Sequence, residues 1–113
     1  MADLLGAFEQ AVLLALVHPA TALGRLAYGR AILKDVQTRL DREVSAGAIY
    51  ATLDRLEAKG MVSSRLGPGT AIRAGRPRRY YAIEAKGVRA LNEARAATKR
   101  IWAGVRLPAK GTA

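Results

Sequence analysis

The chain has 113 residues, half of them hydrophobic, and a formal net charge of +10. This length builds one small domain with one core, near the size at which a partner subunit helps stability. The absence of cysteine excludes disulfides, thiolate chemistry and cysteine metal sites. The longest apolar run is too short to span a membrane, and the first residues lack the basic segment of a signal peptide. We therefore expect a cytoplasmic protein without membrane contact.

The first predicted helix covers residues 4–17, with Asp3 as its N-cap and the His18-Pro19 pair as its stop. Apolar residues lie on nearly all of its sides, which indicates burial on more than one face. In a chain this short we expect a second subunit to cover part of that surface, including Phe8 and Val12. His18 is the only histidine, and we interpret it as a helix-end residue because no other metal ligand or nucleophile accompanies it.

A second helix is predicted from residue 27 to about residue 40, and a turn over residues 41–44 follows it. A third helix then runs between Ser45, its N-cap, and Gly60, where the chain can turn left-handed. Its apolar stripe consists of Ile49, Leu53 and Leu56. Helix, short turn and helix is the geometry in which the second helix of the pair enters a DNA groove.

The side chains on the outer face of this third helix are unusually small. It carries the following residues: Gly47, Ala48, Ala51, Arg55 and Ala58, with Tyr50 on its flank. Small side chains let a helix backbone approach another surface, as a helix in the major groove must. The alternative is an ordinary amphipathic helix whose alanines raise helix propensity. For Tyr50 the alternative to a DNA contact is a ring packed on the hairpin that follows.

Two short strands, over residues 61–66 and 79–83, flank a loop rich in Gly, Pro and Arg, which predicts a hairpin with a basic tip. Residues 1–64 contain seven basic and seven acidic residues, so their charges cancel. Residues 65–113 contain twelve basic residues and two acids, which accounts for the whole net charge. A one-sided positive field is typical of a polyanion binder, although some soluble proteins are simply basic. The acid-free segment 65–79 favours the binder.

After the sequence 84–87 a long helix is predicted to about Arg106, and residues 107–113 are predicted to be a frayed tail. At interhelical spacing this helix carries Leu91, Ala94, Thr98, Ile101 and Val105. We expect this seam to pack against the first helix of a partner subunit. Trp102, the only tryptophan, lies beside the seam, where paired rings of a dimer could hold a flat aromatic molecule. The alternative is that Trp102 fills the dimer core.

Two segments of the chain resemble the signature of the PadR family of bacterial transcriptional regulators. They are residues 47–62, with the sequence GAIYATLDRLEAKGMV, and residues 75–83, with the sequence GRPRRYYAI. The Tyr28-Gly29 pair resembles the one that opens the second helix in these proteins. The chain departs from the family pattern at Ala51, where a proline is common, and at Glu84, where a threonine is usual.

The resemblance spans residues from about 5 to 105 and implies a mainly α fold with a β-hairpin wing. On this view residues 1–83 form a winged helix-turn-helix domain, residues 84–106 form a dimerisation helix, and residues 107–113 form a disordered tail. A single helix after the wing is similar to the small PadR subfamily. The resemblance implies a dimeric repressor that binds near-palindromic double-stranded DNA and is released by a small, often aromatic, effector.

The site residues that we expect fall into three groups. DNA contacts are expected from the recognition helix (Ser45, Ala46, Gly47, Tyr50, Arg55) and from the wing (Arg73, Arg76, Arg78, Arg79). The dimer interface is expected to include Phe8, Val12, Leu91, Thr98, Ile101 and Val105, with Trp102 as an effector contact. We expect no cofactor, no metal and no enzymatic activity, since the sequence lacks the motifs for them. The alternative function is sequence-tolerant binding of DNA or RNA.

Overall fold

A computed structural model of the chain describes residues 4–18, 27–69 and 77–109. In chain order its elements are α1 (Ala7–Val17), β1 (Ala27–Tyr28), α2 (Gly29–Leu40), α3 (Ala46–Ala58), β2 (Val62–Gly69), β3 (Pro77–Ile83) and α4 (Ala85–Trp102). The three strands form one antiparallel sheet in the order β1-β3-β2. The expectations for Asp3, Arg73, Arg76 and residues 110–113 lie outside the described residues.

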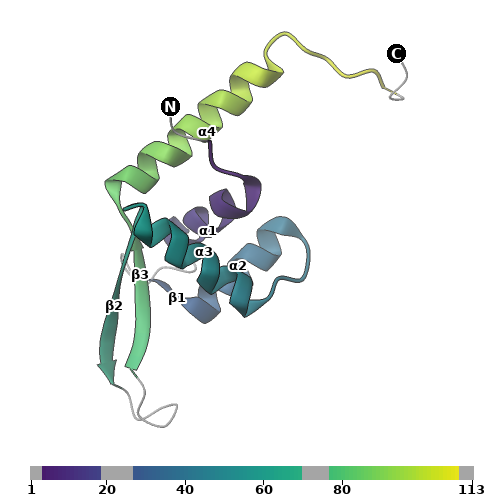
Figure 1. Cartoon of the computed structure of the whole chain (residues 1–113). Coiled ribbons are helices and arrows are strands. Elements are labelled where there is room, and N and C mark those ends of the chain that lie inside the picture. The colour runs from purple at the N-terminus through teal and green to yellow at the C-terminus, as the bar shows by residue number, and fades with distance from the viewer. Residues whose placement is uncertain (1–3, 19–26, 70–76, 110–113) are drawn as a thin grey trace.

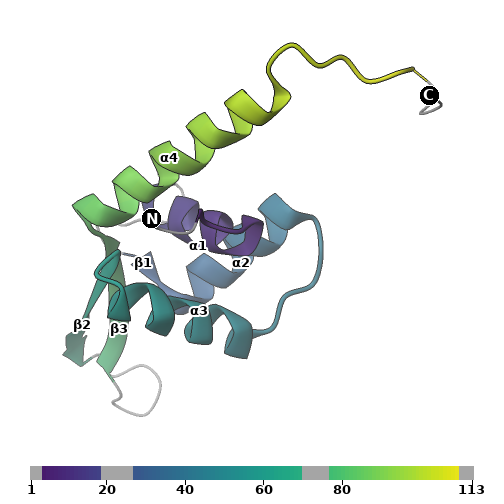
Figure 2. The same cartoon turned by 45° about the horizontal axis from the view of Figure 1, so that its top comes forward.

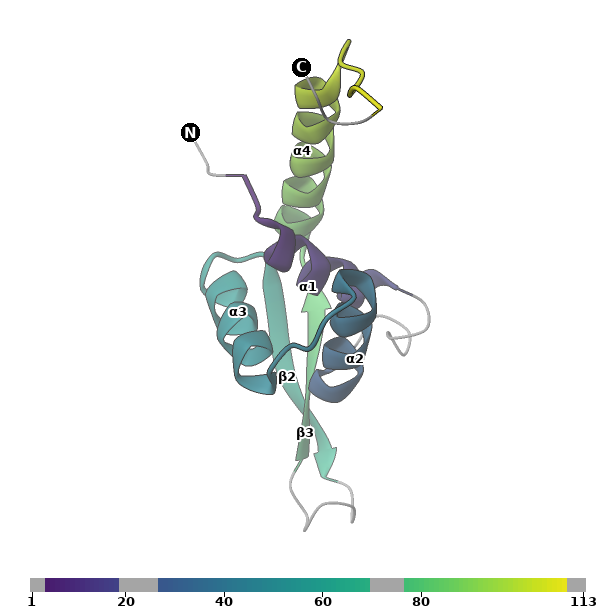
Figure 3. The same ribbon diagram turned by 90° about the vertical axis from the view of Figure 1, so that its right-hand side faces the viewer.

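Helices α1, α2 and α3 form the body of the molecule, and two elements project from it (Figure 1). The β2-β3 hairpin extends from one end of the body and α4 from the other, as the side view shows (Figure 3). Turning the molecule forward places α4 on one side of α1 and α2, and α3 on the other (Figure 2). The radius of gyration is 16.6 Å, compared with about 13 Å for a compact domain of this size. The two projections and the extended segment 103–109 after α4 account for this excess (Figure 1).

The core lies where the three body helices meet the sheet. Its fully buried side chains include the predicted stripe of α3 (Ile49, Leu53, Leu56), two residues of α2 (Ile32, Val36) and two of α1 (Val12, Leu13). The stripe predicted for α3 is therefore confirmed. Val62 of β2, Tyr81 of β3 and Ala94 of α4 also belong to the cluster. Burial of these apolar side chains is the main favourable term that holds the body together.

The predicted start of the first helix is wrong. Helix α1 begins at Ala7, and Gly6 is its N-cap in an extended conformation. The Glu9 carboxylate accepts a hydrogen bond from the Gly6 N–H at 3.2 Å, which satisfies a donor at the helix start without Asp3. Val12 is also misassigned as an interface residue, because the core of its own subunit encloses it completely.

A third strand was missed. Residues Ala27 and Tyr28 were predicted to open the second helix, but they pair with Tyr81 and Tyr80 of β3. Helix α2 starts at Gly29, with Tyr28 as its extended N-cap. A strand of two residues has no detectable alternation, so periodicity could not reveal it.

The boundaries after α3 also differ from the prediction. Strand β2 continues to Gly69 and β3 begins at Pro77, with an irregular register near the end of β2. Helix α4 begins at Ala85, so Gly87 lies inside the helix, and it ends at Trp102 instead of near Arg106. Glu84 does not cap the helix with its side chain, which instead accepts a hydrogen bond from Ser63 Oγ at 2.6 Å.

Gly87 lies where α4 crosses the end of the hairpin. A Cβ at this position would come within 2.5 Å of the Met61 carbonyl oxygen and 2.8 Å of Ile83 Cγ1. Backbone cannot move aside as a flexible side chain can, so the contact requires a glycine. Gly47 differs, because a Cβ there would meet only Ser45 Oγ, at 4.0 Å.

We expect Gly87→Ala to lower the free energy of unfolding by about 1–3 kcal/mol, the typical cost of forcing extra atoms into a packed site. The matched variant Gly47→Ala should raise it by a few tenths of a kcal/mol to about 1 kcal/mol, since alanine is the better helix former. Urea unfolding followed by circular dichroism measures both values. A Gly87→Ala protein as stable as the wild type would contradict this description of the crossing.

Candidate nucleic-acid interface

The first turn of α3 is capped and fixed in orientation. Ser45 Oγ accepts a hydrogen bond from the Ala48 N–H at 3.1 Å, so the predicted N-cap is confirmed. The turn before it is held by Gln37 Nε2, which donates to the Val44 carbonyl at 3.0 Å. Asp41 ends α2 in the left-handed conformation. These contacts fix the angle at which the two helices of the pair meet.

The outer face of α3 is exposed along its whole length. The exposed residues include Gly47, Ala48, Ala51, Arg55 and Ala58, as the helical spacing predicts. Arg55 donates a hydrogen bond from Nη2 to Oγ1 of the buried Thr52 at 3.1 Å. This bond satisfies a buried hydroxyl and holds the arginine close to the helix. The face therefore offers mostly small side chains, with the anchored Arg55 cation and the exposed Asp54 carboxylate on it.

Tyr50 belongs to α3, and its ring lies against the start of α2. A Cβ at Gly29 would overlap the hydroxyl and ring of Tyr50, so the ring packs directly on this glycine. Tyr50 as a whole is 44% exposed. Tyr50 also lies near Tyr81 of β3, so packing beside the hairpin stays an alternative to a DNA contact. The contact with Gly29 also explains why a glycine follows Tyr28.

Arg78 and Arg79, the two predicted wing contacts that lie in the described residues, differ in their surroundings. Arg79 Nη1 donates a hydrogen bond to Ser64 Oγ at 3.0 Å, and Ser64 Oγ donates to the Glu57 carboxylate, with distances of 2.8 and 3.0 Å to its two oxygens. This chain of contacts joins β3, β2 and α3. Arg79 is therefore held toward the recognition helix.

Arg78 lies against an aromatic ring. Its Cζ atom is 4.2 Å from the centroid of the Tyr28 ring, which is a cation–π distance. Tyr28 in turn packs edge-on against Tyr80, with ring centroids 6.3 Å apart and an interplanar angle of 77°. Since side chains alternate along a strand, Arg78 and Tyr80 share the face of β3 opposite to Arg79.

Tyr81 couples the sheet to the recognition helix. Its side chain is buried in the core. Burial raises the pKa of the Tyr81 hydroxyl, the nearby Tyr50 raises this pKa further, and the Arg79 guanidinium opposes the shift. The hydroxyl is consequently neutral at physiological pH. Tyr81, Ser64 and Glu57 were not singled out from the sequence, because contacts between distant positions leave no local pattern.

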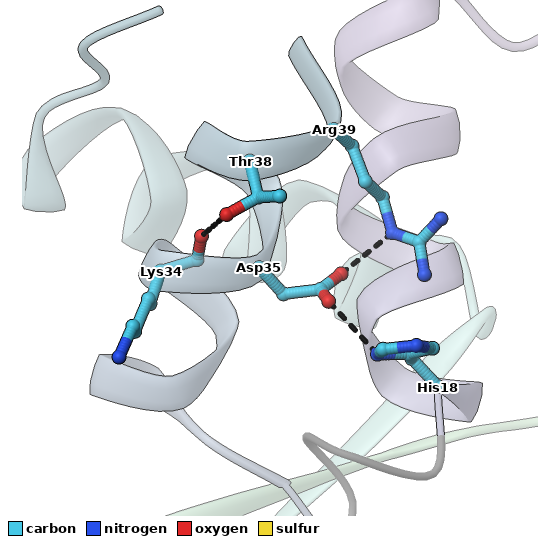
Figure 4. A network of polar contacts seen from close by, with 5 residues as sticks. All are labelled: His18, Lys34, Asp35, Thr38 and Arg39. Carbon is cyan, nitrogen blue, oxygen red and sulfur yellow. Dashed lines mark hydrogen bonds and ion pairs between the residues drawn. The ribbon is translucent and has the colours of Figure 1, made fainter. Parts of the chain in front are cut away.

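A polar cluster at the end of α1 involves the only histidine (Figure 4). His18 Nδ1 lies 3.0 Å from Asp35 Oδ1, although the ring nitrogen is not aligned for a hydrogen bond. Arg39 Nε donates to the other oxygen of Asp35 at 2.6 Å. His18 is the C-cap residue of α1, so it is a helix-end residue as predicted. In the described parts of the chain, no helix is long and apolar enough to cross a membrane.

Residues 21–93 match the family described as "Transcriptional regulator PadR-like family". Among curated protein sequences, none matches this chain. In solved structures, a PadR family transcriptional regulator from Eggerthella lenta is 29% identical, with a TM-score of 0.62. The match covers 82% of this chain and 75% of that one.

A PadR-like transcription factor from Bacteroides fragilis is 27% identical, with a TM-score of 0.63, over 82% of this chain and 81% of that one. F93 from STIV, a winged-helix DNA-binding protein, is 18% identical, with a TM-score of 0.62, over 86% of this chain and 92% of that one. The last likeness supports the fold alone. The family consists of transcription factors and not of enzymes. This chain belongs to the PadR-like family and is a DNA-binding transcriptional regulator with a winged-helix fold.

Proposed function

We propose that the chain is a cytoplasmic dimeric repressor, which binds an inverted-repeat operator and is released by a small aromatic effector. One observation carries the DNA-contact part of this proposal: the outer face of α3 is small and exposed from its capped first turn onward. Such a face lets the helix backbone enter the major groove. The basic hairpin beside it suits phosphates or the minor groove.

The proposed base and backbone contacts come from the recognition helix and the wing. We assign the helix contacts to Ser45, Ala46, Gly47, Tyr50 and Arg55, and the wing contacts to Arg73, Arg76 and Arg78. Arg79 is a weaker candidate for a DNA contact, because one of its N–H groups already serves Ser64. The carboxylate of Glu57, which accepts a hydrogen bond from Ser64, partly offsets the positive charge of Arg79.

The second half of α4 supports the dimer. Ala94 and Ala97 are buried in their own subunit, and Ile101 continues the same helical stripe beyond the body. Ile101 is 71% exposed and Trp102 is 55% exposed, while Val105, which lies after the end of α4, is 57% exposed. Covering apolar surface of this kind contributes about 25 cal/mol per Å² toward association, before the entropy lost on association is subtracted. A partner subunit related by a two-fold axis would provide the cover.

The proposed interface has a narrower set of residues than the sequence suggested. It keeps Phe8, Leu91, Thr98, Ile101 and Val105 and omits the buried Val12. Residues 84–106 then act as the dimerisation segment next to the DNA-binding residues 1–83. Recognition helices in such a dimer should lie about 34–36 Å apart, one turn of DNA.

Sequencing the genomic DNA that the purified protein retains tests the repressor proposal. We expect one inverted repeat to be enriched near a promoter, and reporter expression from that promoter to rise when the protein is removed. Retention of unrelated sequences with equal affinity would instead favour sequence-tolerant nucleic-acid binding. A fall in reporter expression would identify an activator.

We expect Arg78→Ala to weaken binding of every duplex and to reduce the slope of log K against log salt by about one per subunit, because one phosphate contact is lost. Discrimination between operator and unrelated DNA should change little, since phosphates carry no direct sequence information. Fluorescence anisotropy at several salt concentrations measures both quantities. An unchanged salt slope would remove Arg78 from the DNA contacts.

We expect Ile101→Glu to convert the dimer to a monomer at micromolar concentration, since a charge would enter an apolar interface. Ala96→Glu is the matched control, because Ala96 is exposed on the outer side of the same helix. Light scattering distinguishes the two states. A wild-type monomer, or an Ile101→Glu dimer as stable as that of the control, would contradict the proposed interface.

Trp102 is the proposed effector contact, because two such rings would face each other near the two-fold axis. We expect a planar aromatic compound to quench the fluorescence of this single tryptophan and to release operator DNA. A broad panel of planar compounds provides the probes. If no compound quenches, or if quenching leaves operator affinity unchanged, Trp102 fills the dimer core and has no effector role.

A further inference from the structure

We propose that Tyr28 is a positioning residue, which holds the Arg78 guanidinium ready to contact the DNA backbone. This inference rests on the proposed function of the wing and assigns a role to a residue outside both the recognition helix and the hairpin. Tyr28 belongs to β1, the two-residue strand that lies beside β3 and directly precedes α2. It therefore couples the wing to the start of the helix-turn-helix.

The geometry of the Tyr28 ring fixes where Arg78 can be. Tyr28 and Tyr80 are directly opposite each other in the antiparallel ladder, and their rings meet edge to face. This packing, together with the β1-β3 pairing, restricts the Tyr28 ring. The Arg78 guanidinium then lies 4.2 Å from the ring centroid. An arginine near the tip of a hairpin thus has a defined position close to the body.

A cation–π contact leaves the hydrogen-bonding capacity of the arginine intact. The ring interacts with the face of the planar guanidinium, while the N–H donors lie at its edge. Those donors match the geometry of a phosphate. Because the side chain is already ordered, less conformational entropy is lost when it binds DNA.

The neighbouring arginine provides an internal contrast. Arg79 uses an N–H donor for Ser64, in a network that also contains the Glu57 carboxylate. A phosphate approaching Arg79 has to compete with these oxygens. Consecutive arginines of one strand thus have different roles: Arg79 braces the wing against α3, and Arg78 faces DNA with Tyr28 behind it.

A double-mutant cycle on the dimeric protein tests this assignment. Operator affinity is measured by anisotropy for the wild type, Tyr28→Leu, Arg78→Ala and the double variant, with Tyr28→Phe as the conservative control. We expect Tyr28→Leu to weaken binding about two- to five-fold in the wild-type background, the range of an exposed cation–π contact. In the Arg78→Ala background the same change should have no effect, because no guanidinium remains to be positioned.

Tyr28→Phe should keep the wild-type affinity, since it keeps the ring. Three outcomes overturn the proposal: equal weakening by Tyr28→Leu in both backgrounds, which indicates a merely structural role; loss of affinity in Tyr28→Phe, which indicates a direct hydroxyl contact; or no weakening by Tyr28→Leu. Melting temperatures of all variants separate unfolding from weaker binding. An Arg78→Ala protein with normal affinity would instead refute the wing contact itself, and the positioning role with it.

Discussion

Burial of one face of α3 is the constraint on which the rest of the structure depends. Ile49, Leu53 and Leu56 are fully enclosed by the body, so the opposite side of the helix must face outward. That side consists largely of glycine and alanine. A rotation of α3 by one residue would expose apolar side chains and bury polar ones, at a cost of several kcal/mol. The core therefore sets which surface α3 presents outward, and this is the surface that we propose to meet DNA.

Close contacts around the sheet fix the position of the wing, which is the second half of the proposed DNA interface. Gly29 and Gly87 admit close approaches, the first by the Tyr50 ring and the second by the Met61 carbonyl. They bring the recognition helix, the hairpin and α4 to fixed positions relative to the body. Tyr81 then joins the wing to α3 inside the core, and the Ser64 contacts join them at the surface. Thus the wing is anchored at its base, where Arg79 takes part in the contacts to Ser64 and Arg78 lies against Tyr28.

Much of the fold could be predicted from local patterns. The Ser45 cap, the left-handed Gly60 and the apolar stripe of α3 are short-range features, and the structure confirms all three. Strand β1 could not be predicted in this way, because its two residues become a strand only by pairing with β3. The same applies to the Arg78–Tyr28 and Arg79–Ser64 contacts, which join residues about fifty and fifteen positions apart. Val12 was misassigned because a helix that is apolar all round does not reveal which side its own subunit covers.

The most direct test of this account introduces a negative charge where α3 should meet DNA. Gly47→Glu is compared with Ala96→Glu, which adds the same charge to an exposed site on α4. Anisotropy with a duplex selected from the genome gives the affinity of each variant. We predict that Gly47→Glu weakens binding by more than about tenfold, through steric exclusion and phosphate repulsion, while Ala96→Glu binds nearly as the wild type does. Equal affinities for the two variants would show that α3 does not enter the groove.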